Sequence, residues 1–220
     1  MNVRDNLDLA LYLVTDRLIS KLTFAQLLDT VEQACRGGVG LVQLREKEAT
    51  FREYVEMAKA MMEVTHRYQV PLVVDDRVDV ALVAETDGVH VGLDDMDVAD
   101  ARRILGEDKI IGATAKTVER AQQAEREGAD YLGTGAIFEP IYKVKTQRTS
   151  IDKLGEVARS VQIPTVAISG IHRGNLGQLA GSPIAGIAIE VTSLWEAEDS
   201  EGEAKLLREG VIETILKHRR

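Results

Sequence analysis

The sequence is poor in the residues that mark several protein classes. Its 220 residues include one cysteine, Cys35, which excludes an intramolecular disulfide framework and a metal site built from several cysteines. Aromatic residues make up only 4% of the chain, which argues against a stacking surface for nucleic acid or carbohydrate. Cys35 lies in a helical pattern, and we expect it to be a small buried side chain.

Long apolar runs are also absent. No stretch of 18 apolar residues occurs, so we expect no transmembrane helix, and the first residues lack the apolar core of a signal peptide. The net charge of -9 argues against a general binder of nucleic acid or of anionic membranes. We therefore expect a cytoplasmic protein without nucleic-acid or membrane partners. If its substrate is anionic, the positive charges that bind it must be local to the site. The oligomeric state stays open, a homo-oligomer included.

What the chain does contain is a regular alternation of short apolar runs and amphipathic segments. The apolar runs predict strands at 10–14, 39–44, 71–74, 88–92, 110–113, 131–134, 164–168 and 184–189. The amphipathic segments predict helices at 24–35, 51–64, 78–83, 98–105, 117–127, 150–161, 175–179 and 203–218. Such an alternation predicts a parallel sheet covered by helices.

Eight strand–helix units in one chain of this length fit a compact α/β fold, the (β/α)8 TIM barrel. A doubly wound open sheet is the alternative. No linker divides the chain, so residues 1–220 are expected to form a single domain. Within it, 194–220 is expected to be an acidic segment, a solvated lead-in up to 203, followed by a closing helix.

Two successive expected strands end in paired carboxylates. Asp75 and Asp76 follow the third strand, and Asp94 and Asp95 follow the fourth. In a parallel barrel these ends meet at one edge, where the carboxylates repel each other unless a cation lies between them. Mg²⁺ takes such oxygen ligands together with substrate phosphates, and Asp76 and Asp95 are the expected ligands. Helix N-capping is the alternative interpretation, for Asp75 or Asp94 in particular.

Cations follow the second expected strand. Gln43, Arg45 and Lys47 are spaced so that one face of the strand end can carry all three. An arginine fork and a lysine ammonium suit phosphate oxygens. The alternative is a solvated charge cluster paired with Glu46 and Glu48.

A long segment, 135–149, carries Lys143, Lys145 and Arg148 in an otherwise acidic chain. Segments of this length are often binding loops, and a basic one suits a pyrophosphate; a solvated loop is the alternative. Gly170, after the seventh strand, would let backbone N–H groups approach a phosphate. His90 lies inside a strand and is expected to be a packed core histidine.

Taken together, these motifs resemble the thiamin phosphate synthase family. The segments that carry the resemblance, in the family's order and spacing, are LYLVTDR (11–17), GVGLVQLREK (38–47), VVDDRVDVAL (73–82), DGVHVGLDD (87–95), IIGATAKT (110–117), EGADYLGTGAIF (127–138) and IPTVAISGI (163–171). The resemblance implies a (β/α)8 transferase that joins a pyrimidine pyrophosphate to a thiazole phosphate and releases pyrophosphate, with Mg²⁺ as cofactor.

The resemblance also implies roles for individual residues. Asp76 and Asp95 would hold Mg²⁺, and Arg45, Lys47 and Lys143 would be catalytic through their charge. The implied substrate-binding residues are Gln43, Arg45, Lys47, Asp75, Thr114, Lys143, Gly170, Val191 and Thr192. The implied mechanism is dissociative: cations stabilise the departing pyrophosphate, and the aminopyrimidine bears a methylene cation that the thiazole nitrogen captures.

The chain departs from the family pattern at several positions. Asp75 stands where the family usually has Asn, and Pro140 and Tyr142 replace threonines beside the loop lysine. Glu190 and Val191 align with a phosphate loop that normally carries Ser.

Two alternatives therefore stay open. One is a thiazole tautomerase-like isomerase, in which some relatives use a histidine where this chain has Lys116. The other is a non-catalytic phosphate-ligand sensor.

Overall fold

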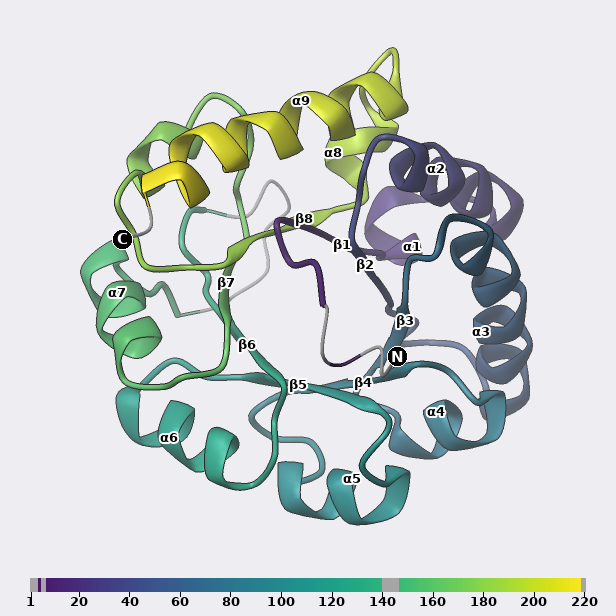
Figure 1. Cartoon of the computed structure of the whole chain (residues 1–220). Coiled ribbons are helices and arrows are strands. Elements are labelled where there is room, and N and C mark those ends of the chain that lie inside the picture. Colours follow the sequence, from purple (N-terminus) through teal and green to yellow (C-terminus); the bar gives the residue numbers. More distant parts are fainter. Residues whose placement is uncertain (1–3, 5–6, 140–146, 219–220) are drawn as a thin grey trace.

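The structure is a computed structural model that describes residues 4, 7–139 and 147–218. Eight parallel strands form a closed barrel, in which each strand pairs with its neighbours in sequence and the last pairs with the first (Figure 1). The strands are β1 (Leu11–Val14), β2 (Leu41–Leu44), β3 (Leu72–Asp75), β4 (Gly88–Val91), β5 (Ile110–Thr114), β6 (Tyr131–Thr134), β7 (Thr165–Ile168) and β8 (Gly186–Glu190). The expected (β/α)8 barrel is confirmed, and the open-sheet alternative is wrong.

Helices surround the barrel (Figure 1). Among the described residues they are α1 (Arg17–Ser20), α2 (Phe24–Arg36), α3 (Phe51–Thr65), α4 (Val78–Ala84), α5 (Val98–Leu105), α6 (Val118–Arg126), α7 (Ile151–Arg159), α8 (Thr192–Trp195) and α9 (Ser200–Thr214), with 3-10 turns η2 (His66–Tyr68), η3 (Leu176–Leu179) and η4 (Leu216–His218). The sequence did not predict α1, α8 or η2, because they are too short for a periodic pattern.

Local capping explains where the longer helices begin. Thr23 and Thr50 form capping boxes with Gln26 and Glu53, which satisfy backbone N–H groups that the first turns of α2 and α3 leave free. The Ser150 hydroxyl caps α7 by accepting from Lys153 N. Neither Asp75 nor Asp94 is an N-cap, since α4 and α5 begin after Arg77 and Asp97. The capping alternative for the acidic strand ends is therefore wrong.

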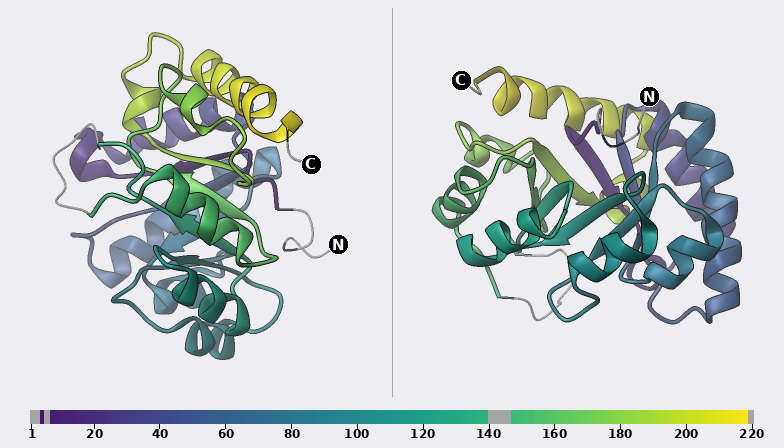
Figure 2. Two further views of the ribbon diagram at one scale, coloured as in Figure 1. Left: turned by 90° about the vertical axis from the view of Figure 1, so that its left-hand side faces the viewer. Right: turned by 60° about the horizontal axis from the view of Figure 1, so that its bottom comes forward.

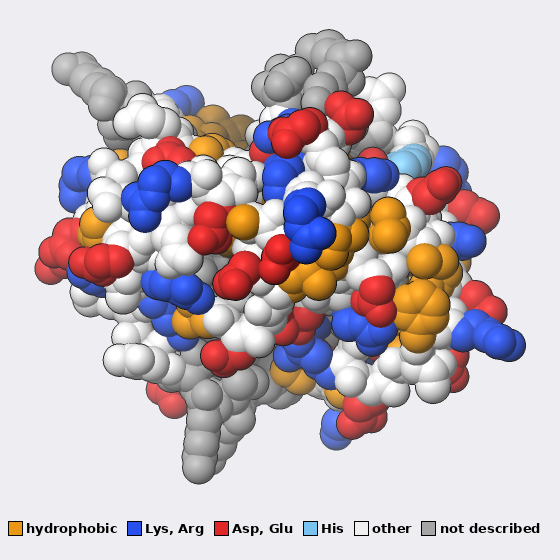
Figure 3. All heavy atoms as spheres, turned by 90° about the horizontal axis from the view of Figure 1, so that it is seen from below, with side chains coloured by type: hydrophobic (Ala, Val, Ile, Leu, Met, Phe, Trp, Pro, Cys, Tyr) orange, Lys and Arg blue, Asp and Glu red, His pale blue; other side chains and the backbone are white. Residues whose placement is uncertain are grey.

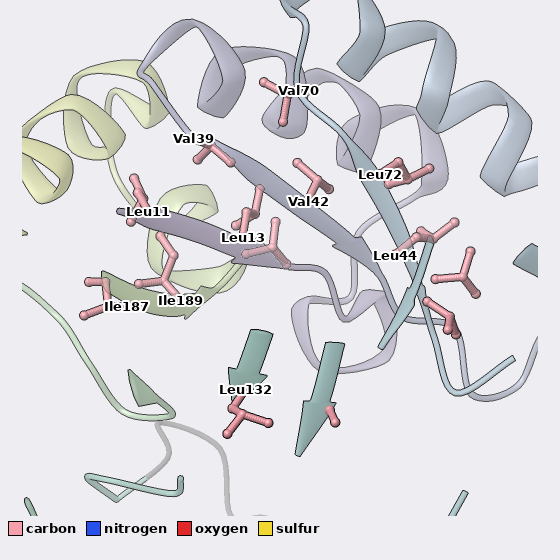
Figure 4. Close-up of a cluster of buried hydrophobic side chains, with 14 of the residues drawn as sticks. Leu11, Leu13, Val39, Val42, Leu44, Val70, Leu72, Leu132, Ile187 and Ile189 are labelled. Atoms are coloured by element: carbon pink, nitrogen blue, oxygen red, sulfur yellow. The ribbon is translucent and has the colours of Figure 1, made fainter. Parts of the chain in front are cut away.

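Two clusters of buried hydrophobic side chains form the core of the barrel. The larger one fills the space between strands and helices, where Leu13, Val42 and Leu72 extend from neighbouring strands (Figure 4). The smaller one lies inside the barrel and includes Leu9, Tyr12, Val14, Leu41, Val73, Ile110, Tyr131, Val166 and Ala188. Because side chains alternate along a strand, every strand except β4 contributes to both clusters, while β4 has Gly88 and His90 at its inward positions. Cys35 belongs to the outer cluster, so the expectation that it is buried is confirmed.

The C-terminal helix α9 lies outside the barrel, where it packs on α2, α8 and β1 (Figures 1 and 2). It begins earlier than predicted, because the Asp199 side chain caps it by accepting from Gly202 N. Glu201 and Glu203 therefore lie in its first turn, where the helix dipole favours negative charge. The expectation that the whole segment up to Glu203 is a solvated lead-in is wrong.

The outer surface carries charges of both signs. On the face built by α4, α5 and α6, acidic and basic side chains are interspersed with small apolar groups (Figure 3). Over the part of the chain that the structure describes, no helix combines the length and apolarity needed to span a membrane.

Candidate active site

A cavity of about 320 Å³ opens at the carboxyl ends of the strands, the end at which TIM barrels place their catalytic residues. Side chains from both inside the barrel and its rim contribute to the wall. The lining residues are Tyr12, Val14, Asp16, Ile19, Gln43, Arg45, Asp75, His90, Thr114, Lys116, Gly133, Gly135, Ala136, Val166, Ile168, Ser169 and Glu190. Four of the expected site residues line this cavity: Gln43, Arg45, Asp75 and Thr114. A fifth, Gly170, directly follows the lining residue Ser169 in the chain.

Cations and carboxylates alternate along the rim. Arg45 contacts Asp16, and its Nε lies 3.4 Å from Asp75 Oδ2. Lys47 Nζ lies 3.0 Å from the same Asp75 oxygen and also contacts Asp76. Burial, and secondarily the charge of Asp76, raises the pKa of Asp75 to about 6 despite these two cations. The predicted cationic strand end is thus in direct contact with the predicted acidic one.

Asp76 and Asp95 meet at the rim, although 19 positions separate them in the chain. Their carboxyl groups are within hydrogen-bonding distance, and Asp95 Oδ2 also accepts from Gly92 N at 2.9 Å. Partial burial and the Asp76 carboxylate raise the pKa of Asp95. Hydrogen bonds from Asp95 and Lys47 lower the pKa of Asp76 against the opposing effect of burial. A divalent cation would relieve this repulsion.

The donor set at this point fits Mg²⁺. Two carboxylates that face each other are protein ligands that Mg²⁺ commonly uses, with water and substrate phosphates completing its shell. Among the residues that the structure describes, no group of three or more His, Cys, Asp or Glu could hold a metal.

Backbone strain also marks this rim. Asp76 has a φ of +61°, in the left-handed region that residues other than glycine seldom adopt. Its N–H donates to His90 O at 2.8 Å, which ties the turn after β3 to the neighbouring strand β4. Such strain is often found at functional sites.

Below the rim, five polar side chains form one hydrogen-bonded row across the barrel. Gln43 Nε2 donates to Tyr12 Oη at 2.6 Å, and Tyr12 Oη lies 2.8 Å from Tyr131 Oη. His90 Nδ1 lies 3.0 Å from Tyr131 Oη, and His90 Nε2 lies 3.0 Å from Thr114 Oγ1. The prediction that His90 is buried is confirmed, and burial lowers its pKa to about 4, so the ring is neutral at pH 7.

Gly170 has a physical reason to be glycine that the sequence did not reveal. Ser169 and Gly170 both have positive φ, and a Cβ on Gly170 would lie 2.4 Å from Glu139 O. The turn after β7 therefore packs closely against the segment that follows β6. Asn175 Nδ2 donates to Gly170 O at 2.8 Å and holds the turn in place.

Besides Gly170, three expected binding residues that the structure describes are not part of the cavity wall: Lys47, which lies at the rim, and Val191 and Thr192. The Val191 side chain is fully buried in the outer cluster, its N–H donates to Val14 O, and its carbonyl accepts from Leu194 and Trp195. Thr192 is also buried, and its Oγ1 has no partner among the described residues. The neighbouring Glu190, by contrast, lines the cavity, and burial and the charge of Asp16 raise its pKa.

The remaining loop predictions fall partly outside the described residues. Pro140, Tyr142, Lys143 and Lys145 lie in the segment 140–146, so their expected roles stay predictions. Arg148 NH2 donates to Ile137 O at 3.3 Å.

Comparison with known proteins identifies the family. The sequence model described as thiamine monophosphate synthase matches residues 11–191, a range that contains all eight strands. The chain belongs to the thiamine monophosphate synthase family.

Several relatives in this family are close in sequence. The chain is 48% identical over 197 residues to thiamine-phosphate synthase 2 of Streptococcus pneumoniae, covering 90% of this chain and 92% of the relative. It is 47% identical over 193 residues to thiamine-phosphate synthase of Clostridium tetani, covering 88% and 91%. A solved structure, thiamine phosphate pyrophosphorylase from Pyrococcus furiosus, superposes with a TM-score of 0.84 at 36% identity, covering 97% of this chain and 100% of that one.

Membership in the thiamine monophosphate synthase family confirms the resemblance seen in the sequence, but several cavity residues escaped sequence reasoning. Tyr12, Tyr131 and Asp16 line or support the cavity without having been predicted to bind substrate. The two tyrosines could have been found from alternation, because each occupies an inward position of its strand. Asp16 comes soon after β1, a position at which barrels place functional residues.

Proposed function

We propose that this member of the family is a thiamin phosphate synthase, a transferase that couples hydroxymethylpyrimidine pyrophosphate with hydroxyethylthiazole phosphate and releases pyrophosphate. The relatives of known name support this activity, since the chain covers about nine-tenths of their length. The single structural observation that carries the proposal is the rim, where Arg45 and Lys47 face the carboxylates of Asp75, Asp76 and Asp95 beside the cavity.

The two cations provide the phosphate grip in this proposal. Arg45 presents a planar fork, and Lys47 a point charge, to the pyrophosphate that leaves the pyrimidine. As the carbon–oxygen bond breaks, negative charge builds on the pyrophosphate, and fixed positive charges at the rim stabilise it. Lys143 would add a third charge. No side-chain nucleophile is required, because the ring of the aminopyrimidine carries the methylene cation until the thiazole nitrogen captures it.

Asp76 and Asp95 would hold Mg²⁺. When bound, this ion supplies further positive charge to the pyrophosphate oxygens. Gly92 keeps the backbone close to Asp95, because a Cβ there would lie 2.5 Å from Asp95 Oδ2.

The cavity below the rim holds the rings in this proposal. Gln43 and Thr114 reach the cavity from opposite sides of the barrel, on β2 and β5, and offer polar groups to the edge of the pyrimidine. Gly170 would contribute to the thiazole phosphate site, as the family pattern implies, whereas the Thr192 side chain is buried away from the cavity. A cytoplasmic location, with small phosphorylated molecules as the substrates, belongs to the same proposal.

A pyrophosphate-release assay with both substrates tests the proposal. We expect release that requires both substrates and Mg²⁺, together with formation of thiamin phosphate. An isomerase would change the thiazole phosphate without releasing pyrophosphate, and a sensor would bind the substrates without turnover. Either result would replace the proposed activity.

A further inference from the structure

The five polar side chains beneath the cavity form one continuous hydrogen-bonded chain, in which the direction of each bond constrains the next. It runs from Gln43 on β2 through Tyr12 and Tyr131 to His90 and Thr114 on β5, with links of 2.6 to 3.0 Å. The four members before Thr114 are at least 92% buried, because their exposed fractions are 4%, 1%, 0% and 8%. A buried chain of this kind must satisfy its hydrogens internally.

Counting hydrogens gives the chain a direction. Tyr12 accepts from the Gln43 amide, so its single hydrogen is donated to Tyr131. Tyr131 then donates its own hydrogen to His90 Nδ1. A neutral imidazole with an accepting Nδ1 carries its hydrogen on Nε2 and donates it to Thr114 Oγ1. Rotating the Gln43 amide by 180° would reverse every one of these bonds.

The direction determines what the two ends offer to a ligand. At one end, one hydrogen of the Gln43 amide nitrogen is donated to Tyr12, which orients the amide and leaves its oxygen as an acceptor beside the second N–H. At the other end Thr114 accepts from His90, which leaves its hydroxyl hydrogen to be donated toward the cavity that it lines. The barrel thus presents an acceptor on the β2 side and a donor on the β5 side.

The barrel makes room for this arrangement. A Cβ on Gly112 would lie 2.1 Å from Tyr131 Cζ and 2.5 Å from His90 Nδ1, so only glycine fits at this inward position of β5. The Tyr12 and Tyr131 rings meet edge to face with centroids 5.7 Å apart, which fixes their hydroxyl groups relative to each other.

We propose that Tyr12 and Tyr131 are positioning residues that lock the Gln43 amide and the His90 tautomer, so that the cavity selects a nitrogen heteroaromatic ring bearing an amino group. Such a ring presents a donor and an acceptor on its edge, which match the two fixed ends of the chain. The proposal rests on the proposed function, because the aminopyrimidine pyrophosphate is the substrate of that class. It assigns the recognition of this substrate to two tyrosines that need not touch it.

The direct test is the tautomer of His90 in the whole protein, measured by ¹⁵N NMR with labelled histidine. The resonances are assigned by their loss in His90→Gln. We expect the hydrogen on Nε2 in the wild type and a changed tautomer population in Tyr131→Phe, which removes the partner of Nδ1. A hydrogen on Nδ1 in the wild type, or an unchanged population in the variant, would overturn the proposal.

The functional test compares three Tyr→Phe variants. Tyr12→Phe and Tyr131→Phe should each raise KM for the pyrimidine pyrophosphate at least about tenfold while leaving KM for the thiazole phosphate unchanged. Tyr54→Phe is the matched control, because it removes a buried hydroxyl that donates to the backbone carbonyls of Leu44 and Asp75 and to no side chain of the row. Equal shifts for both substrates, equal shifts in the control, or no shift would contradict the positioning role.

Failure of the proposed function is distinguishable from failure of this inference. If the wild type releases no pyrophosphate, the synthase proposal fails, while the His90 tautomer still decides whether the chain is ordered. Affinity is then measured by calorimetry with 4-amino-5-hydroxymethyl-2-methylpyrimidine as the probe. Weaker binding in Tyr131→Phe than in Tyr54→Phe supports the selection of an amino heteroaromatic, and equal binding contradicts it.

Discussion

The two ends of the barrel surround their carboxylates with different partners. At the amino end, Asp130 Oδ2 accepts from Ile111 N and pairs with Arg102, each at 2.7 Å. Asp87 Oδ2 likewise accepts from Leu72 N at 2.7 Å and lies 2.8 Å from His66 Nε2. Asp130 thus links β5 to Arg102 of α5, and Asp87 links β3 to His66 of η2.

At the carboxyl end, acids face acids. Asp75 adjoins Asp76, Asp76 faces Asp95, and Glu190 is raised in pKa by burial and by Asp16. Arg45 and Lys47 relieve this repulsion only in part, and its concentration at one rim is what a site for an external cation or substrate would need. The two ends thus differ in what surrounds their acids: N–H donors at the amino end, and other acids together with cations at the carboxyl end.

The largest effect is expected from removing one of the facing acids. Asp95→Ala should lower pyrophosphate release at least about 100-fold with the fold retained, because the site loses half of its carboxylate pair. Release is measured in the coupled assay, and folding by circular dichroism. Asp94→Asn, an exposed neighbour, is the control and should retain activity. Full activity in Asp95→Ala would refute the metal assignment.

A large effect on stability is expected at the opposite end. Arg102→Ala should lower the free energy of unfolding by about 3–5 kcal/mol, because it leaves Asp130 without its buried partner and frees the carbonyls of Gly106, Lys109 and Gly128. The activity of the folded fraction should not change. The control Arg103→Ala breaks an exposed pair with Asp100 and should cost less than about 1 kcal/mol. Similar losses in urea unfolding of the two variants would contradict the comparison.

A gain in stability is expected from neutralising Asp75, whose pKa is raised by burial and by the charge of Asp76. The folded pKa of Asp75 is about 6 against an ordinary 3.8, so its ionisation destabilises the fold increasingly as pH rises from about 4 to 6, and the cost stays above that range. Asp75→Asn should therefore raise Tm by about 2–4 °C at pH 7.5 and by little at pH 4. The matching Asp87→Asn, at the amino end, should lower Tm at pH 7.5. A gain in both variants, or in neither, would remove the distinction between the ends.

The smallest effect is expected at Glu190. Its pKa is raised, so the charged form destabilises the fold at neutral and higher pH, and this cost disappears when acid protonates the group. Glu190→Gln should raise Tm by about 1–2 °C at pH 8 without a gain at pH 4. Because the Glu190 carboxylate would repel a bound phosphate, its removal should also lower KM for the thiazole phosphate. Thermal melts and initial rates check the two effects, and an increased KM would show that the carboxylate binds substrate.

Much of the fold could be predicted because each unit is locally encoded. The runs at Ile110–Thr114 and Tyr131–Thr134 read as strands from their apolar content, and Thr50 and Ser150 mark helix starts through their own hydroxyls. The gathering of Asp76, Asp95 and Lys47 followed from the rule that parallel strand ends share an edge. Two local predictions were wrong: the alternative in which Asp75 or Asp94 caps a helix, and the start of the last helix at Glu203.

The sequence by itself determined the alternation of strands and helices, and the residues that follow each strand. Only the tertiary structure decided which groups touch: that Lys47 contacts both Asp75 and Asp76, that the Val191 side chain is buried in the outer core, and that Tyr12 meets Tyr131 across the barrel. The physical reason is that local hydrogen bonding and periodicity act within a few residues, whereas pKa values and hydrogen-bond direction depend on neighbours that closure of the barrel brings together.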